Sequence, residues 1–225
     1  MPTSPRRTAA RTLSRLLMTA LLAAAPLGLS GCWLFAASQE SQGTKVPAQY
    51  LGLADKSLAI VVYADQASTD EFPSSRTEIS NFLAAAFRTK LPSARLLDQR
   101  EVSAWQDDTL NWNALPEKDI GKHFSTDRVL YIELIAYTTR ANASFGDLQG
   151  HIKAVCKVFE VDQPGNGPAW SDVVEVRWPK DRPLDPTTGS EIAVRKRALE
   201  LFSTELVNRF VEHREYPDSL RDQAQ

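Results

Sequence analysis

Apolar residues after position 56 alternate between short continuous runs and helical spacing. Residues 57–64 (SLAIVVYA) form an uninterrupted β-branched run, which predicts a strand buried on both faces of a sheet. After a polar loop, apolar residues recur at α-helical spacing up to Lys90, and Pro92 ends this helix. The helix is expected to begin with a capping box at 75–78 (SRTE), in which the Ser75 side chain caps the helix and Glu78 reaches back.

The middle of the chain predicts one further strand and two short helices. We expect a strand at 94–97, a helix from Asp98 that carries Val102 and Trp105, a loop at 107–116 and a small helix at 117–124. Alternating apolar and polar residues then predict strands at 128–138, 149–162 and 170–178. The residues expected on one buried face are Leu130, Ile132, Leu134 and Ala136 in the first of these strands and Ile152, Ala154, Cys156 and Val158 in the second.

The turn sequence at 164–168 (PGNGP) predicts that the last two strands form a hairpin. A final helix is expected from Ser190 to about Arg214. Its apolar stripe is Ile192, Leu199, Phe202, Leu206 and Phe210. The element order β-α-β-α-(α)-β-β-β-α predicts a single α/β domain built on a mixed sheet.

The first 31 residues have the pattern of a secretory signal. All charges before Cys32 are arginines, and residues 16–29 are a Leu/Ala-rich stretch of about 14 residues, shorter than the roughly 20 that a membrane-spanning helix needs. The sequence Leu29-Ser30-Gly31-Cys32 follows and resembles the lipobox of bacterial lipoproteins. That resemblance implies cleavage before Cys32, lipidation of its thiol and a bilayer as the first partner of the chain.

The signal sets the expected organisation of the chain. We predict a lipoprotein signal peptide at 1–31, a lipidated cysteine and flexible tether at 32–55, the α/β domain at 56–214 and a C-terminal tail at 215–225. Several acyl chains hold a protein stably on a bilayer. The expected location is the bacterial cell envelope, and Trp33 after the cysteine favours the outer membrane, facing the periplasm.

Composition and charge narrow the possible functions. The 225 residues are 43% hydrophobic and 24% charged, which excludes a disordered chain and a polytopic membrane protein. The net charge is −2; four of the 26 basic residues and none of the 28 acidic ones lie in the signal, so the mature chain carries −6. An acidic chain argues against nucleic acid as a partner.

Several segments of the domain resemble a known superfamily. They are the first strand at 58–62 (LAIVV), the segment 94–102 (ARLLDQREV), the segments 120–122 (IGK) and 126–134 (TDRVLYIEL), and the strand at 153–162 with Trp170-Ser171. Together they resemble the superfamily of the TolB amino-terminal domain, the curli-secretion lipoprotein CsgG and the penicillin-binding-protein activator LpoB. The resemblance covers residues 56–214 and implies the same α/β fold.

Motifs for catalysis are missing from the sequence. It has no GxSxG, GxGxxG, Walker, HExxH or CxxC pattern, and we expect no enzyme, no cofactor and no metal site. Asp147 and His151 could meet across a turn, although a solvated loop pair explains them as well. Cys156 occupies a core position of a strand, where burial makes a thiol inert.

Two tryptophans are the candidate partner-binding residues. Trp105 and Trp112 lie in or beside a polar segment, and exposed aromatic side chains anchor protein partners. The alternative is that Trp105 packs on the sheet and Trp112 covers a loop. The leading hypothesis is a non-catalytic envelope lipoprotein that binds a protein partner or forms homo-oligomers. An accessory lipoprotein of a transporter that holds a lipid or apolar ligand, and a hydrolase using Asp147 or His151, remain as alternatives.

Overall fold

The chain is seen in a computed structural model that describes residues 43–141 and 146–216. Its elements in chain order are β1 (Thr44–Val46), β2 (Ser57–Tyr63), α3 (Gln66–Glu71), α4 (Ser75–Lys90), β3 (Arg95–Leu96), α5 (Gln99–Asp108), the 3₁₀ turn η2 (Trp112–Ala114), α6 (Glu117–His123), β4 (Arg128–Arg140), β5 (Leu148–Glu160), β6 (Trp170–Trp178), α7 (Glu191–Asn208) and β7 (His213–Glu215).

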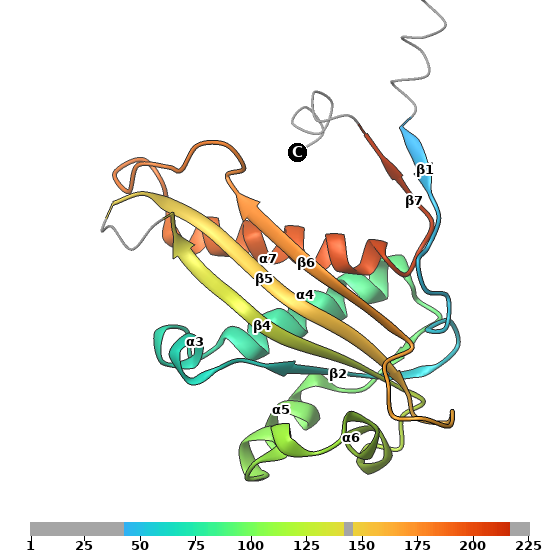
Figure 1. Ribbon diagram of the computed structural model, residues 1–225. Helices are drawn as coiled ribbons and strands as arrows, with labels where there is room; N and C mark the ends of the chain where they lie inside the picture. Colours follow the sequence, from blue (N-terminus) through green and yellow to red (C-terminus); the bar gives the residue numbers. More distant parts are fainter. Residues whose placement is uncertain (1–42, 142–145, 217–225) are drawn as a thin grey trace, which may run out of the picture. The chain divides into compact units, whose positions relative to one another are not determined.

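A five-stranded mixed sheet organises residues 47–213, which form one compact unit. The strand order is β3-β2-β4-β5-β6; β2 runs parallel to both of its neighbours, whereas β4, β5 and β6 form an antiparallel meander (Figure 1). This arrangement confirms the predicted α/β fold with a mixed sheet. The short strands β1 and β7 form a separate two-stranded sheet.

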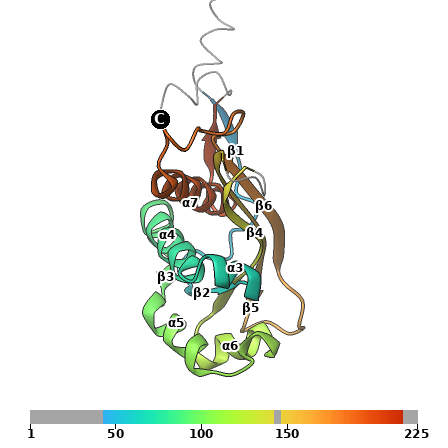
Figure 2. The same cartoon turned by 90° about the vertical axis from the view of Figure 1, so that its left-hand side faces the viewer.

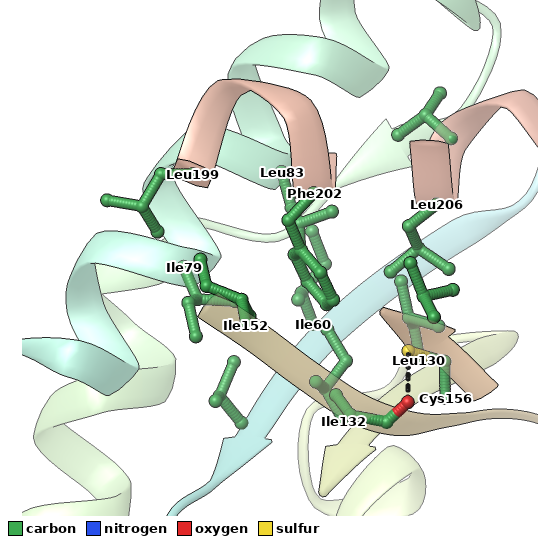
Figure 3. Close-up of a cluster of buried hydrophobic side chains, with 14 of the residues drawn as sticks. Ile60, Ile79, Leu83, Leu130, Ile132, Ile152, Cys156, Leu199, Phe202 and Leu206 are labelled. Carbon is green, nitrogen blue, oxygen red and sulfur yellow. Dashed lines mark hydrogen bonds between the residues drawn. The ribbon is translucent and has the colours of Figure 1, made fainter. Parts of the chain in front are cut away.

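The larger core lies between the sheet and the helices α4 and α7. Figure 2 shows both helices on the same side of the strands. Ile60 of β2, Ile132 of β4 and Phe202 of α7 are all at most 1% exposed, and Figure 3 shows them converging with the leucines of the two helices. Cys156 points into this core, where its sulfur lies 4.0 Å from the Ala154 carbonyl (Figure 3). The apolar side chains predicted to be buried in the strand at 57–64 and in the hairpin therefore pack together in this larger core.

A smaller core lies on the other face of the sheet, under α5, η2 and α6. Its buried members from the strands are Ala59, Val61, Val129, Tyr131 and Phe159. Side chains that alternate along a strand point to opposite faces, which is why residues 58–62 of β2 and 129–132 of β4 are apolar at every position. Gln106 of α5 fixes the helix to the sheet, because its side-chain amide donates to the Val62 carbonyl at 3.0 Å.

A β-bulge in β4 corrects the predicted alternation. The register shifts between Leu134 and Ala136, so that Leu134 pairs with Ala154 but Ala136 pairs with Lys153. Ile135 is the extra residue and is 54% exposed. Ala136 therefore leaves the face on which it was predicted, and Tyr137 takes its place in the core.

The helix starts and ends also differ from the predictions. The cap of α4 is Ser74, whose hydroxyl donates to Glu78 at 2.9 Å, whereas Ser75 is buried. The polar loop before it contains the short helix α3, capped by the Asp65 side chain. Helix α7 ends at Asn208 rather than near Arg214, because the chain turns there.

The turn after α7 places Phe210 among other aromatic rings. Its ring stacks on Phe87 at 5.8 Å and meets Trp170 edge-on at 4.8 Å. Phe210 is buried as predicted, although it lies outside the helix, and Ile192 of the predicted stripe is 71% exposed. Beyond this turn the chain forms β7.

Part of the segment predicted as a flexible tether is packed against the sheet. Leu53 is 1% exposed, and the Tyr50 hydroxyl donates to Glu160 at 2.6 Å. Burial and this hydrogen bond raise the pKa of Tyr50 to about 12. Buried Arg128 binds the same carboxylate and also contacts Asp162 at 2.6 Å. Residues 47–55 therefore pack as part of the compact unit, although they were predicted to belong to the flexible tether.

Candidate functional site

The lipobox residues Leu29, Ser30, Gly31 and Cys32 lie outside the described residues. The structure places the other two candidates in and after α5: Trp105 lies in α5, and Trp112 lies in the connection between α5 and α6. We call residues 109–116 of this connection the leucine loop, because Leu110 and Leu115 stand near its two ends.

Backbone hydrogen bonds hold the leucine loop in one conformation. The N–H of Thr109 donates to the Trp105 carbonyl at 2.9 Å, which closes α5, and the N–H of Leu115 donates to the Trp112 carbonyl at 3.1 Å. Asn111 has φ = 56°, a left-handed conformation that asparagine tolerates better than most residues. The loop is thus an ordered turn with internal hydrogen bonds.

Trp112 anchors the leucine loop in the smaller core. It is 8% exposed, and its ring lies 6.1 Å from Tyr63 of β2 and 6.4 Å from Tyr131 of β4. Burial, followed by the nearby carboxylates of Glu117 and Glu133, raises the pKa of Tyr131 well above its ordinary value. Trp112 is therefore packed in the smaller core, whereas the alternative considered for it was that it covers a loop.

Trp105 is half-buried and forms the edge of the same aromatic cluster. Its ring stacks on His123 at 5.1 Å and meets Phe124 edge-on at 5.2 Å. The two rings come from the end of α6, so that Trp105 joins α5 to α6. Only the outer part of its ring remains available to a partner.

The exposed apolar surface of this region belongs to the two leucines. Leu110 is 89% exposed and Leu115 is 42% exposed. Sequence reasoning overlooked them because neither lies in a periodic pattern and the neighbouring tryptophan is larger. A useful signal would have been the two isolated leucines that flank a tryptophan in an otherwise polar loop.

Carboxylates surround the leucine loop. Residues 107–119 contain four acidic side chains and one lysine, Lys118. Asp107 pairs with Arg76 of α4 at 2.6 Å, and Asp119 pairs with Lys122 at 2.8 Å. Among the described residues, Asp108 and Glu117 have no ion-pair partner, and each stands two positions outside one of the leucines.

A second exposed surface lies on the same side of the sheet, beyond the cover of α5 and α6. Tyr131 and Phe159 face these helices, and alternation places Glu133, Lys157, Val155 and Lys153 on the same face further along β4 and β5. In β6, Val173 pairs with Val155 and is 49% exposed. We call this part of β4–β6 the open sheet face.

Ion pairs surround Val155 and Val173 on the open sheet face. Lys153 contacts Glu175 at 2.9 Å, His151 contacts the same carboxylate at 3.0 Å, and Lys157 contacts Glu133 at 3.3 Å. The hydrogen bonds from Lys153 and His151 lower the pKa of Glu175 to about 2. Arg177 approaches the same carboxylate at 2.9 Å, so that Glu175 is held by three cationic or titratable side chains.

The residues considered for hydrolysis have other surroundings. His151 Nε2 lies 3.0 Å from Glu175 on the neighbouring strand, and the same carboxylate also contacts Lys153. Burial raises the pKa of the Cys156 thiol far above its ordinary value, so this sulfur is not a nucleophile. Within residues 43–141 and 146–216, no three His, Cys, Asp or Glu side chains gather as metal ligands. In the same part of the chain, no helix has the length and apolar character to span a membrane.

Comparison with known proteins identifies structures with a similar course of the chain. No protein-family model matches the sequence, and no curated protein matches it. The PelC dodecamer from Paraburkholderia phytofirmans is 11% identical with a TM-score of 0.43, over 76% of this chain and 98% of that chain. Lipoprotein GNA1162 from Neisseria meningitidis is 15% identical with a TM-score of 0.42, over 68% and 96%. The LpoB C-terminal domain from Salmonella enterica is 15% identical with a TM-score of 0.33, over 62% and 90%. None of these likenesses assigns an activity or a partner to this chain.

Proposed function

We propose that this protein is a non-catalytic lipoprotein of the bacterial envelope that binds a protein partner, or another copy of itself, through the leucine loop. The lipid anchor is Cys32, behind Leu29, Ser30 and Gly31, and the outer membrane facing the periplasm is its site. The observation that carries the binding function is the exposure of Leu110 and Leu115 on a loop that Trp112 fixes to the core.

The energetics favour a rigid loop as a contact surface. Burying an exposed leucine side chain contributes about 1.5–3 kcal/mol. Two such residues together supply about 3–6 kcal/mol, which reaches only the lower part of the roughly 4–15 kcal/mol of lost freedom on association in solution. A loop that is already ordered adds little further entropic cost. An anchor that confines the protein to one membrane raises the effective concentration of a partner in the same membrane.

The leucine loop is tested by replacing its apolar tips. In the full chain, Leu110→Ser together with Leu115→Ser removes the apolar contacts without touching Trp112. Co-purification from detergent-solubilised envelopes, with partners identified by mass spectrometry, measures the effect. The matched control is Ile192→Ser on α7, which removes one apolar side chain that is 71% exposed elsewhere. We expect the partner to be lost from the double variant and retained by the control; equal recovery from both contradicts the proposal.

The anchor needs a separate test. Cells are fed a radioactive fatty acid and the protein is immunoprecipitated, from the wild type and from Cys32→Ser. We expect label in the wild type alone, because Cys32 supplies the thiol that carries the lipid. Equal labelling of both proteins contradicts the anchor and the envelope location that rests on it.

A further inference from the structure

Two surfaces on this chain have complementary patterns. The leucine loop presents Leu110 and Leu115, with Asp108 before them and Glu117 after them and no ion pair to either carboxylate among the described residues. The open sheet face presents Val155 and Val173 opposite each other, with Lys153 and Lys157 two positions to either side of Val155 on β5. One surface is apolar with an acidic rim, and the other is apolar with three cationic side chains, Lys153, Lys157 and Arg177, against two carboxylates, Glu133 and Glu175.

The lysines of the open sheet face can bind a second carboxylate. Lys153 lies 2.9 Å from Glu175, and Lys157 lies 3.3 Å from Glu133. A lysine ammonium has three donors, so one ion pair leaves donors for another acceptor. Both side chains are about a third exposed, at 35% and 28%. The four steps from Lys153 to Lys157 span about 13 Å along the strand, which leaves room for Val155 between them.

From this complementarity we infer that the occupant of the open sheet face is the leucine loop of a second copy of this chain. The inference rests on the proposed function, and it deepens it by naming the partner. Both surfaces lie on the side of the sheet that α5 and α6 partly cover. In the assembly that we expect, two copies face each other with these sides, and a two-fold axis relates each leucine loop to the open sheet face of the other copy. A closed dimer with two identical contacts is the expected assembly.

The charges favour this occupant over a lipid surface. The acidic rim of the leucine loop repels the anionic headgroups that attract basic segments. A second copy supplies both the apolar surface and the opposite charge, and the anchor of each copy confines both to one membrane.

Cysteine pairing in the membrane tests the contact directly. Two full-length copies with different epitope tags are co-expressed, one carrying Leu110→Cys and the other Val173→Cys, and membranes are treated with a mild oxidant. Native Cys156 does not compete, because it is fully buried. The matched control replaces Val173→Cys by Gly167→Cys, on an exposed turn with no atom near its Cβ position. We expect a disulfide-linked dimer with both tags from the 110–173 pair and only background from the 110–167 pair; equal yields overturn the inference.

Charge reversal gives a second, independent readout. Asp108→Lys with Glu117→Lys is expected to reduce the 110–173 yield about tenfold, since two rim pairs become repulsive. Supplying Lys153→Glu with Lys157→Glu on the opposite copy is expected to restore it, whereas a reversal without effect overturns the charge complementarity. If the leucine variants lose a different protein and no 110–173 disulfide forms, the proposed function stands and the second-copy inference fails. If neither occurs, both fail.

Discussion

Replacing Trp112 by alanine should be far more costly than replacing its exposed neighbour Leu110. Trp112 is 8% exposed and contacts three aromatic rings, those of Tyr63, Trp105 and Tyr131, at centroid distances of 6.1, 6.3 and 6.4 Å. Truncating a buried tryptophan costs about 3–5 kcal/mol, and the higher values apply where the site cannot collapse. Here two of the rings stand on paired strands, so we expect about 4 kcal/mol.

The assay is urea unfolding of the chain from residue 33 onward, followed by far-ultraviolet circular dichroism. The midpoint multiplied by the slope gives the free energy of unfolding. Leu110→Ala is the matched control, because a side chain that is 89% exposed makes few contacts and its loss should change stability by less than about 0.5 kcal/mol. Equal losses for the two variants would refute the view that Trp112 anchors the loop while Leu110 is free to bind.

Three further predictions concern the rest of the domain. Gly150→Ala should lower the free energy of unfolding in urea by about 1–3 kcal/mol, because its Cβ would lie 2.6 Å from that of Ala198 on α7. The control Gly167→Ala has no atom near its Cβ position and should leave the free energy of unfolding unchanged. An unchanged free energy for Gly150→Ala would show that α7 can move away. The pKa of Glu175 is lowered from 4.5 to about 2, so its contribution to stability is complete above pH 4.5 and is lost as pH falls towards 2. Wild type and Glu175→Gln should therefore differ in stability at pH 6 and converge near pH 2, and a constant difference in acid unfolding curves would contradict this. Cys156 should react with a maleimide only after unfolding, and rapid labelling of the native protein by mass spectrometry would contradict its burial.

The main elements of the fold were predictable because burial is strong and regular there. The strand β2, the β5–β6 hairpin and the helix α4 follow from apolar runs, alternation and helical spacing, and all three are confirmed. Alternation failed at Ile135, because a bulge leaves no mark in the pattern of apolar residues and moves Ala136 to the other face. The end of α7 was missed for a related reason: Phe210 kept the helical spacing, but its packing on Phe87 requires the chain to turn.

The burial of the two candidate tryptophans was not predictable from the local sequence. Aromatic residues in a polar segment indicated the connection between α5 and α6. Which of them is buried depends on Tyr63 and Tyr131, which lie 49 and 19 positions from Trp112 in the sequence, and no local pattern reveals those contacts. The packing of residues 47–55 could not be predicted from the local sequence either. Tyr50 binds Glu160, which lies 110 positions away, and this contact holds a segment that was predicted as part of the tether against the sheet.

The most direct test of the central claim is site-specific photo-cross-linking at Leu110 in the intact envelope. A photoreactive amino acid at position 110 captures whatever lies against the leucine loop, and the same residue at Gly167 reports background on an exposed turn. We predict a discrete cross-linked product at position 110, identified by mass spectrometry, that disappears when Asp108 and Glu117 are both changed to lysine. Equal patterns at positions 110 and 167 would contradict the assignment of this loop as the binding surface, and a product that survives the charge reversal would contradict the charge complementarity.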